Sequence, residues 1–306
     1  MTQATPTRPT IQAGTSIRRR RPFRKWFRDL GWRHVVAFGA LVFALFPALW
    51  TMSAAFNPLG TLTTQQLIPD SVSLVNFREL LSEDVPFRAW YVNTLVVGGV
   101  AAGANMMLSA FAAYAFSRMR FTGRRVGLLT VLLIQMFPQL LAFIAIFLMM
   151  DSISNFFPAV GLGTLIGLIL VYMGGAMGVN TWLMKGFFDT IPSSLDESAK
   201  VDGATHGQIF FRIILPLAAP ILAVMFLLGF IFAINEYILA SAILGQGDPS
   251  HFTLAVGLSR YLLDGFTERW GPFAAGSILA GVPVIILFIF LQRYIVSGLT
   301  QGAVKG

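Results

Sequence analysis

The stretch IPSSLDESAKVDGATHGQIFFRIILPLAAP, residues 191–220, is the longest polar interval between the strongly apolar runs in the second half of the chain. The runs on either side are long enough to cross a bilayer, which takes about 20 residues of α-helix. Because they are continuous rather than alternating, they predict helices and not the strands of a β-barrel. The sequence therefore predicts an all-α polytopic membrane protein from which this polar segment projects.

Composition supports the same class. The chain has 306 residues, of which 56% are hydrophobic and only 12% are charged, whereas soluble domains carry about 25% charged residues. It has no cysteine, which excludes disulfides, thiol nucleophiles and cysteine-based metal sites. Its histidines, His34, His206 and His251, are far apart in sequence, so we expect no metal site.

The apolar runs divide the chain into a tail, a six-helix transmembrane domain over residues 34–292 and a second tail. The six spans are predicted at about 34–55, 90–116, 126–150, 163–182, 217–239 and 272–291. Pro138 predicts a kink in the third span. Residues 1–33 form a basic tail whose Thr-, Pro- and Gln-rich beginning is expected to be disordered. Twin arginines before an apolar run also fit an export signal, but the five later spans favour a retained tail.

The positions of lysine and arginine predict the orientation, since these residues concentrate on the cytoplasmic side. With the N-terminus inside, 18 of the 22 lie in the tails and the loops on the inner side. Both termini are therefore expected in the cytoplasm, including the C-terminal tail 293–306. The same distribution accounts for the net charge of +8 without a nucleic-acid partner.

Motifs for chemistry are absent. The sequence has no G-x-x-x-x-G-K-[ST] and no Gly-Lys pair, so it contains no Walker-type nucleotide site. No catalytic triad, paired carboxylates or metal-ligand constellation stands out, and we expect neither catalytic residues nor a cofactor. The chain is therefore not expected to be an enzyme, and the energy for any work comes from a partner subunit or an ion gradient.

Glu236 is the clearest ionisable residue inside a predicted span, near the external end of the fifth. Such residues are costly in lipid and mark candidate functional sites. One interpretation places it in a translocation pathway or gate. A second makes it a carboxylate that reaches the interface or bonds between helices, and a third makes it a proton-coupling group.

The stretch 191–220 predicts two helices. Ser194 and Glu197 fit a capping box at the start of the first, and Gly203 supplies its C-terminal stop. A second helix is expected from near Thr205 to Leu215-Pro216, with one apolar face formed by Ile209, Phe210, Ile213 and Ile214. Such a face on a projecting segment fits either a protein interface or a helix lying in the headgroup layer.

The pattern Glu197-Ser198-Ala199-x-x-Asp202-Gly203-Ala204, followed by Leu215-Pro216, resembles the EAA loop of bacterial ABC importer permeases. Ser198 departs from it by standing where the family has alanine. The resemblance implies a type I importer permease fold in the bacterial inner membrane. It also implies that residues 191–216 form a coupling loop in which Glu197, Ser198, Ala199, Asp202, Gly203 and Ala204 dock into a separate ATPase.

Further motifs are similar to carbohydrate permeases. Asn235-Glu236-Tyr237 matches their N-E-[FY] pattern and makes these residues pathway or gate candidates. The segments 252–257, 270–275 and 292–306 resemble maltose/maltodextrin permeases. In that family the C-terminal tail, here with Gly302, Val304, Lys305 and Gly306, reaches the ATPase dimer interface, and the loop before span six contacts the binding protein.

The resemblance thus implies import of maltose, maltodextrin or a related α-glucoside, powered by ATP hydrolysis in a partner. The implied partners are a homologous second permease (MalF-like), an ABC ATPase dimer (MalK-like), an extracytoplasmic sugar-binding protein, the sugar and the bilayer. The alternative is an ion-coupled secondary transporter that uses Glu236.

Overall fold

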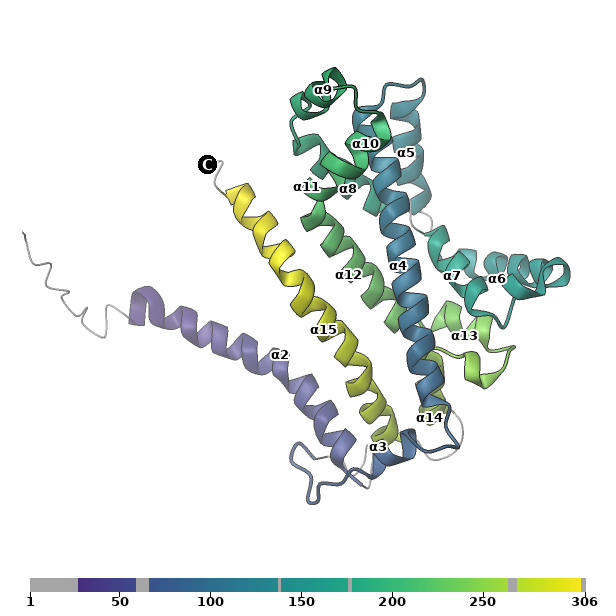
Figure 1. Ribbon diagram of the computed structural model, residues 1–306. Helices are drawn as coiled ribbons and strands as arrows, with labels where there is room; N and C mark the ends of the chain where they lie inside the picture. Colours follow the sequence, from purple (N-terminus) through teal and green to yellow (C-terminus); the bar gives the residue numbers. More distant parts are fainter. Residues whose placement is uncertain (1–26, 59–65, 137–138, 176–177, 264–268, 304–306) are drawn as a thin grey trace, which may run out of the picture. The chain divides into compact units, whose positions relative to one another are not determined.

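The computed structural model describes residues 27–58, 66–136, 139–175, 178–263 and 269–303 (Figure 1). These residues form helices joined by turns, and no strand occurs among them. The chain divides into two units, residues 1–49 and residues 50–306. Most of the predicted basic tail, residues 1–26, lies outside the described residues.

The first unit consists of a π-helical turn, η1 (Phe27–Gly31), and most of helix α2 (Trp32–Phe56). Apolar side chains of α2 are exposed around the helix, with Phe38 and Phe43 about two-thirds or more accessible. A helix that is apolar on all sides suits contact with lipid.

The second unit is organised around α4 (Phe87–Arg118). This helix packs against α7 (Leu165–Gly174), α8 (Val179–Thr190), α12 (Ala219–Asn235) and α14 (Leu254–Leu263). Small residues permit the close approach of α4 and α12: Gly98 lies against the Phe230 ring, and Gly229 lies against Ala102.

The second unit contains further helices. Helix α15 (Trp270–Ala303) packs along α12 and against α14 and α3 (Val75–Leu80). The others are α5 (Arg124–Gln135), α6 (Gln139–Phe156), η3 (Pro158–Val160), α9 (Ser194–Val201), α10 (His206–Ile209), η4 (Phe210–Ile214), α11 (Leu215–Leu217), α13 (Ile238–Leu244) and η5 (Pro249–His251).

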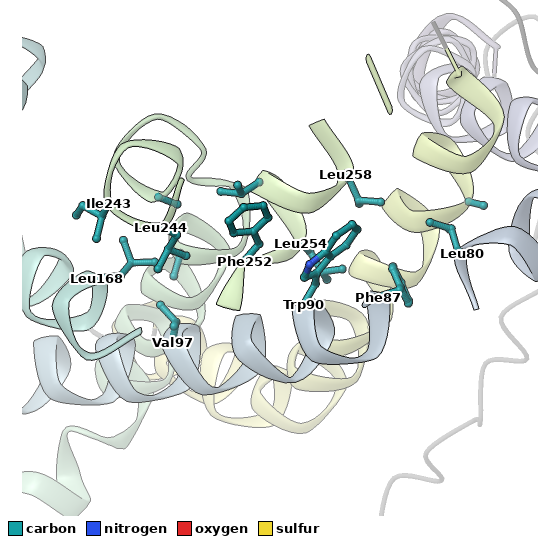
Figure 2. Close-up of a cluster of buried hydrophobic side chains, with 14 of the residues drawn as sticks. Leu80, Phe87, Trp90, Val97, Leu168, Ile243, Leu244, Phe252, Leu254 and Leu258 are labelled. Atoms are coloured by element: carbon teal, nitrogen blue, oxygen red, sulfur yellow. The ribbon is translucent and has the colours of Figure 1, made fainter. Parts of the chain in front are cut away.

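Three clusters of buried apolar side chains involve α4, and the two larger ones lie toward its ends. One includes Trp90, Phe252 and Leu254 and joins the first turns of α4 to α14, α13 and α7 (Figure 2). The other includes Tyr114, Phe188 and Phe210 and joins the last turns of α4 to α8 and α10. Figure 1 accordingly shows α14 near one end of α4, and α9 and α10 near the other.

Three described helices are long and apolar enough to cross a membrane: α2, α4 and Trp270–Ile295 of α15. The number rises to five if two bent pairs each count as one span, namely α7 with α8, bent by 57°, and His206–Leu217 with α12, bent by 78°. The predicted span 126–150 falls on α5 and α6, each of which is shorter, and Pro138 lies outside the described residues. The count of six therefore stays a prediction.

The ends of the predicted spans differ from the helices in two places. Helix α15 continues without interruption from Trp270 to Ala303, through the position at which a separate tail was expected. The described part of the segment between the predicted fifth and sixth spans is largely helical and contains η5 and α14. Its short amphipathic helix α14 is below the length of a span, so the apolar-run criterion could not find it.

Candidate functional site

The segment between α8 and α12 begins with α9, which ends as the sequence predicted. Gly203 has φ +82°, in the left-handed region that glycine adopts without cost. The Gly203 amide donates to the Lys200 carbonyl (3.0 Å), and the Ala204 amide donates to the Ala199 carbonyl (2.9 Å). This pair of bonds is a Schellman motif, which satisfies carbonyls left open at the helix end.

The start of α9 differs from the prediction. Ser193 precedes the helix, and its side chain accepts no hydrogen bond from the first turn. Its backbone is already helical (φ −65°, ψ −21°), whereas a capping hydroxyl needs an extended backbone. The predicted capping box of Ser194 and Glu197 is therefore wrong, because Ser194 lies inside the helix.

A capping box forms at α10 instead. Thr205 has an extended backbone, and its Oγ1 accepts a hydrogen bond from the Gln208 amide (3.3 Å). The Thr205 amide donates to Gln208 Oε1 (2.8 Å). The predicted start of the second helix near Thr205 is confirmed.

The second helix continues further than predicted. After α10 the chain makes the π-helical turn η4 and the short α11, so Leu215 and Pro216 lie within helical turns. Proline is tolerated there because it occupies the first positions of α11. The break comes instead at Ala218, where the helix direction bends by 78° into α12.

The apolar face of the second helix is buried within the chain itself. Ile209, Phe210 and Ile214 are almost fully buried, whereas Ile213 is half-buried. The Phe210 ring lies 5.1 Å from the Tyr114 ring of α4, centroid to centroid, and the cluster includes Phe188 of α8. Both earlier interpretations of this face, a partner interface and the headgroup layer, are therefore wrong.

An ion pair that the sequence did not reveal holds α9 to α4. Arg118 Nε, at the end of α4, lies 2.9 Å from Asp196 Oδ2, and their side chains are only 11% and 8% exposed. Arg118 Nη2 also donates to the Ile191 carbonyl (2.7 Å). Removing one partner of a buried pair costs about 3–5 kcal/mol in soluble proteins. Asp196 and Glu197 are adjacent acidic residues, and the sequence motif does not show which of them is buried.

The residues predicted to dock into an ATPase occupy the outer side of this segment. Glu197, Ser198, Asp202 and Gly203 are exposed. Ala199 and Ala204 are half-buried against the cluster below. Val201 is 89% exposed. The arrangement thus presents acidic side chains and two exposed apolar side chains, Leu195 and Val201, on a helix that the Arg118–Asp196 pair attaches to α4.

Glu236 lies where α12 ends and α13 begins. Glu236 Oε1 accepts a hydrogen bond from the Leu239 amide (2.8 Å), and Oε2 accepts from the Ala240 amide (2.9 Å). The Tyr172 hydroxyl of α7 donates to Oε2 (2.7 Å). The carboxylate therefore serves the first turn of α13 and joins it to α7. Of the three interpretations, this geometry favours the carboxylate that bonds between helices.

The other predicted residues are placed only in part. Asn235 and Tyr237 are exposed beside Glu236, and Asn235 Nδ2 donates to the Ile231 carbonyl (2.8 Å). Gly302 lies in the last turn of α15, whereas Val304, Lys305 and Gly306 fall outside the described residues. Within the described ranges, no group of three His, Asp or Glu side chains could hold a metal ion.

The match to a known family decides the identity. Residues 105–301, which include α9, α10 and the Glu236 break, match the model of the family described as "Binding-protein-dependent transport system inner membrane component". The chain belongs to this family. The match covers the segment between α8 and α12 and most of the helical unit, and the resemblance to importer permeases found in the sequence is confirmed.

Individual relatives cover nearly the whole chain. The galactooligosaccharides transport system permease protein GanQ of Bacillus subtilis is 40% identical over 92% of this chain and 98% of its own length. The maltose/maltodextrin transport system permease protein MalG of Vibrio parahaemolyticus is 39% identical over 89% and 95%. A chain of a bacterial ABC transporter that imports the acidic polysaccharide alginate superposes with TM-score 0.71 and 26% identity over 88% and 97%.

These likenesses confirm the all-α fold of a type I ABC importer permease. This permease is an inner-membrane component, and the ATPase of such an importer is a partner subunit. The importer also includes a second permease and an external binding protein. The alternative of an ion-coupled secondary transporter finds no support among the relatives.

Proposed function

We propose that this permease imports maltose, maltodextrin or a related α-glucoside. The observation that supports this choice of sugar most directly is the 39% identity of the chain to a maltose/maltodextrin permease across 95% of that protein's length. The segments 252–257, 270–275 and 292–306 carry the same likeness. GanQ, whose name assigns it galactooligosaccharides, is similar to the same degree at 40% identity, so galactooligosaccharides are the competing substrates.

We also propose which kinds of partner chain complete the importer. A MalF-like chain supplies the other half of the pore, and a MalK-like ATPase dimer supplies the power. A sugar-binding protein delivers the substrate at the outer face. ATP closes the ATPase dimer, and the permease then passes from an inward-facing to an outward-facing state.

The proposed topology has six spans, at about the ranges given above, with both termini in the cytoplasm. The distribution of lysine and arginine supports it, with 18 of 22 on the inner side. This orientation places α9 and α10 in the cytoplasm. It places η5 and α14, at the opposite end of α4, on the outer side.

In this proposal α9 is the coupling helix. Glu197, Asp202 and the neighbouring Ser198, Ala199, Gly203 and Ala204 dock into a cleft of the ATPase. The exposure of both acids and of Val201 supports this role, because an apolar side chain flanked by charges suits a protein interface. On the other side of α9, the buried Asp196 pairs with Arg118 of α4, and Ala199 is half-buried.

Two further groups of residues have proposed roles. Asn235 and Tyr237 line the pathway or gate near the outer end of α12, where Glu236 fixes the break between helices. Their exposure on a membrane helix supports this, because polar side chains in lipid favour a protein- or water-lined face. Gly302, Val304, Lys305 and Gly306 reach the ATPase dimer interface.

Reconstituted transport tests the proposal. The permease, its second permease, the ATPase and the binding protein are placed in proteoliposomes with ATP inside. Labelled maltose, maltotriose, trehalose and a β-galactooligosaccharide are then added outside. We expect uptake of α-glucosides that requires both ATP and the binding protein. Uptake of the β-galactoside alone would refute the assigned sugar, and uptake driven by an ion gradient without ATP would refute the coupling.

A further inference from the structure

The inner end of α4 is a junction of several elements. Arg118 joins it to Asp196 of α9 and to the carbonyl of Ile191. The Ser117 hydroxyl donates to Asp189 Oδ1 at the end of α8 (2.6 Å). Arg124 Nε, at the start of α5, donates to the Phe116 carbonyl (2.7 Å). The end of α4 thus binds the segment before α9 and α9 itself, together with the ends of α5 and α8.

The covalent connection from α9 to α12, the next long helix, is less rigid than this junction. Between them lie the Gly203 turn, the π-helical turn η4 and the break at Ala218, with its bend of 78°. A π-turn and a broken helix can absorb displacement by changes in backbone dihedrals. A push on α9 is therefore expected to pass more directly through its side-chain attachment to α4 than along the covalent chain into α12.

The opposite end of α4 holds another segment that is distant in sequence. The Trp90 indole N–H donates to the Pro249 carbonyl (2.7 Å). Asn93 Nδ2 donates to the carbonyls of Ser250 (2.8 Å) and Phe252 (3.0 Å). The Leu254 amide donates to Thr94 Oγ1 (2.7 Å). Figure 2 shows Trp90 lying among Phe252, Leu254 and Leu258 in this cluster.

Between these two ends α4 is one helix of 32 residues, about 48 Å at 1.5 Å per residue. No proline interrupts it. A helix of this kind transmits displacement along its axis better than a chain of short helices and turns. The outer segment, defined as residues 249–254, and the coupling helix α9 are thus fastened to opposite ends of a single rod.

We propose that α4 is the strut that carries motion between the coupling helix and the outer segment, and that Arg118 is the positioning residue that fastens its inner end. The inference rests on the proposed coupling role of α9. Movement of α9 with the ATPase displaces α4 through the Arg118–Asp196 pair. The displacement then reaches residues 249–254 through Trp90, Asn93 and Thr94. In the reverse direction, contact at the outer face changes the position of α9.

A fluorescent reporter on the outer side tests the strut. The chain has no cysteine, so Gln246→Cys, at an exposed position close to the outer segment, accepts a single environment-sensitive dye in a complex whose partner chains also lack cysteine. In the complete importer, ATP with vanadate is expected to change the emission. The emission change and the stimulation of ATP hydrolysis by sugar-loaded binding protein are both recorded.

Arg118→Gln is the first variant, and Arg120→Gln is its matched control, because Arg120 is an exposed arginine two residues away. We expect Arg118→Gln to reduce both the emission change and the stimulation at least about fivefold, in the range of measured couplings between sites. Arg120→Gln is expected to change neither. A full emission change in an assembled Arg118→Gln importer would overturn the proposal, as would the absence of any change in a wild-type importer that transports.

If Arg118→Gln does not assemble, a variant at the outer end of α4 tests the strut instead. Asn93→Leu removes two hydrogen bonds to the outer segment and lies at the far end of α4 from the ATPase. It is expected to assemble with the ATPase and to lose the emission change, which a purely local role of Arg118 would not predict. A full response in this variant refutes the strut. A wild-type complex that takes up no sugar refutes the proposed function instead.

Discussion

Replacing Gly203 by alanine tests whether the backbone geometry at the end of α9 matters for its proposed coupling role. Gly203 has φ +82°, and a methyl group added there meets no atom within 4 Å. The cost is therefore conformational rather than steric, about 1–2 kcal/mol for a non-glycine residue in the left-handed region. An energy of this size shifts a local opening equilibrium by about 5- to 30-fold.

Gly207→Ala is the matched control. Gly207 lies in α10 four residues later, its φ is not positive, and it too has no atom within 4 Å of an added methyl group. Alanine in a helix is favoured over glycine by about 0.5–1 kcal/mol. The same chemical change is thus expected to weaken the segment at position 203 and to leave it intact or strengthen it at position 207.

Hydrogen exchange in the assembled importer measures the effect. The amides of Gly203 and Ala204 bond to α9 carbonyls, so their exchange reports on the helix end. We expect exchange about 5- to 30-fold faster in Gly203→Ala, with a parallel fall in the stimulation of ATP hydrolysis by the binding protein. The exchange rate of Gly203→Asn is expected to lie between those of the wild type and of Gly203→Ala, because asparagine tolerates the left-handed region better than alanine. Equal exchange in the alanine variants at 203 and 207 would refute the reasoning.

Three further changes probe other parts of the unit. Glu197→Lys reverses an exposed charge and is expected to weaken co-purification with the ATPase while leaving the melting temperature of the permease unchanged; unchanged co-purification argues against docking through α9. Glu236→Gln keeps an oxygen acceptor for α13 and is expected to retain ATP-driven uptake, whereas Glu236→Ala removes the cap at a cost of about 1–2 kcal/mol, visible as earlier thermal unfolding; complete loss of uptake in an assembled Glu236→Gln importer would revive ion coupling. Gly257→Ala places a methyl group inside the Trp90 indole and is expected to cost about 1–3 kcal/mol, and a melting curve like that of the wild type would contradict this packing.

The sequence predicts the helical class because its signals are local. Continuous apolar runs identified α2, α4 and the first part of α15, and a glycine after a short polar helix identified the left-handed stop at Gly203. The capping box predicted at Ser194 and Glu197 is absent, whereas Thr205 and Gln208, which fit the same short pattern, form one. Two matches to one short pattern can be separated only by the backbone conformation before each helix.

Long-range contacts explain what the sequence did not predict. Asp196 and Arg118 are 78 positions apart, and each has a plausible local role, one at a helix start and the other in a basic loop. The same holds for Trp90 and Asn93, whose partners lie at residues 249–252. Periodicity shows that a face will be covered, but it does not show which element covers it.

The division of residues 191–220 into buried and exposed sides limits which substitutions could alter the proposed docking of this segment alone. Ile209, Phe210 and Ile214 hold it against α4 and α8, and Asp196 anchors it from beneath. A substitution at any of these positions is expected to alter the fold and the proposed docking surface together. If α9 docks as proposed, changes that affect docking alone should be confined to the exposed side chains, above all Glu197, Val201 and Asp202. If the ATPase of another importer can replace the cognate one, the substitutions that permit the exchange should therefore fall on that outward side, and an exchange achieved through the buried positions would argue that the segment docks by a different face.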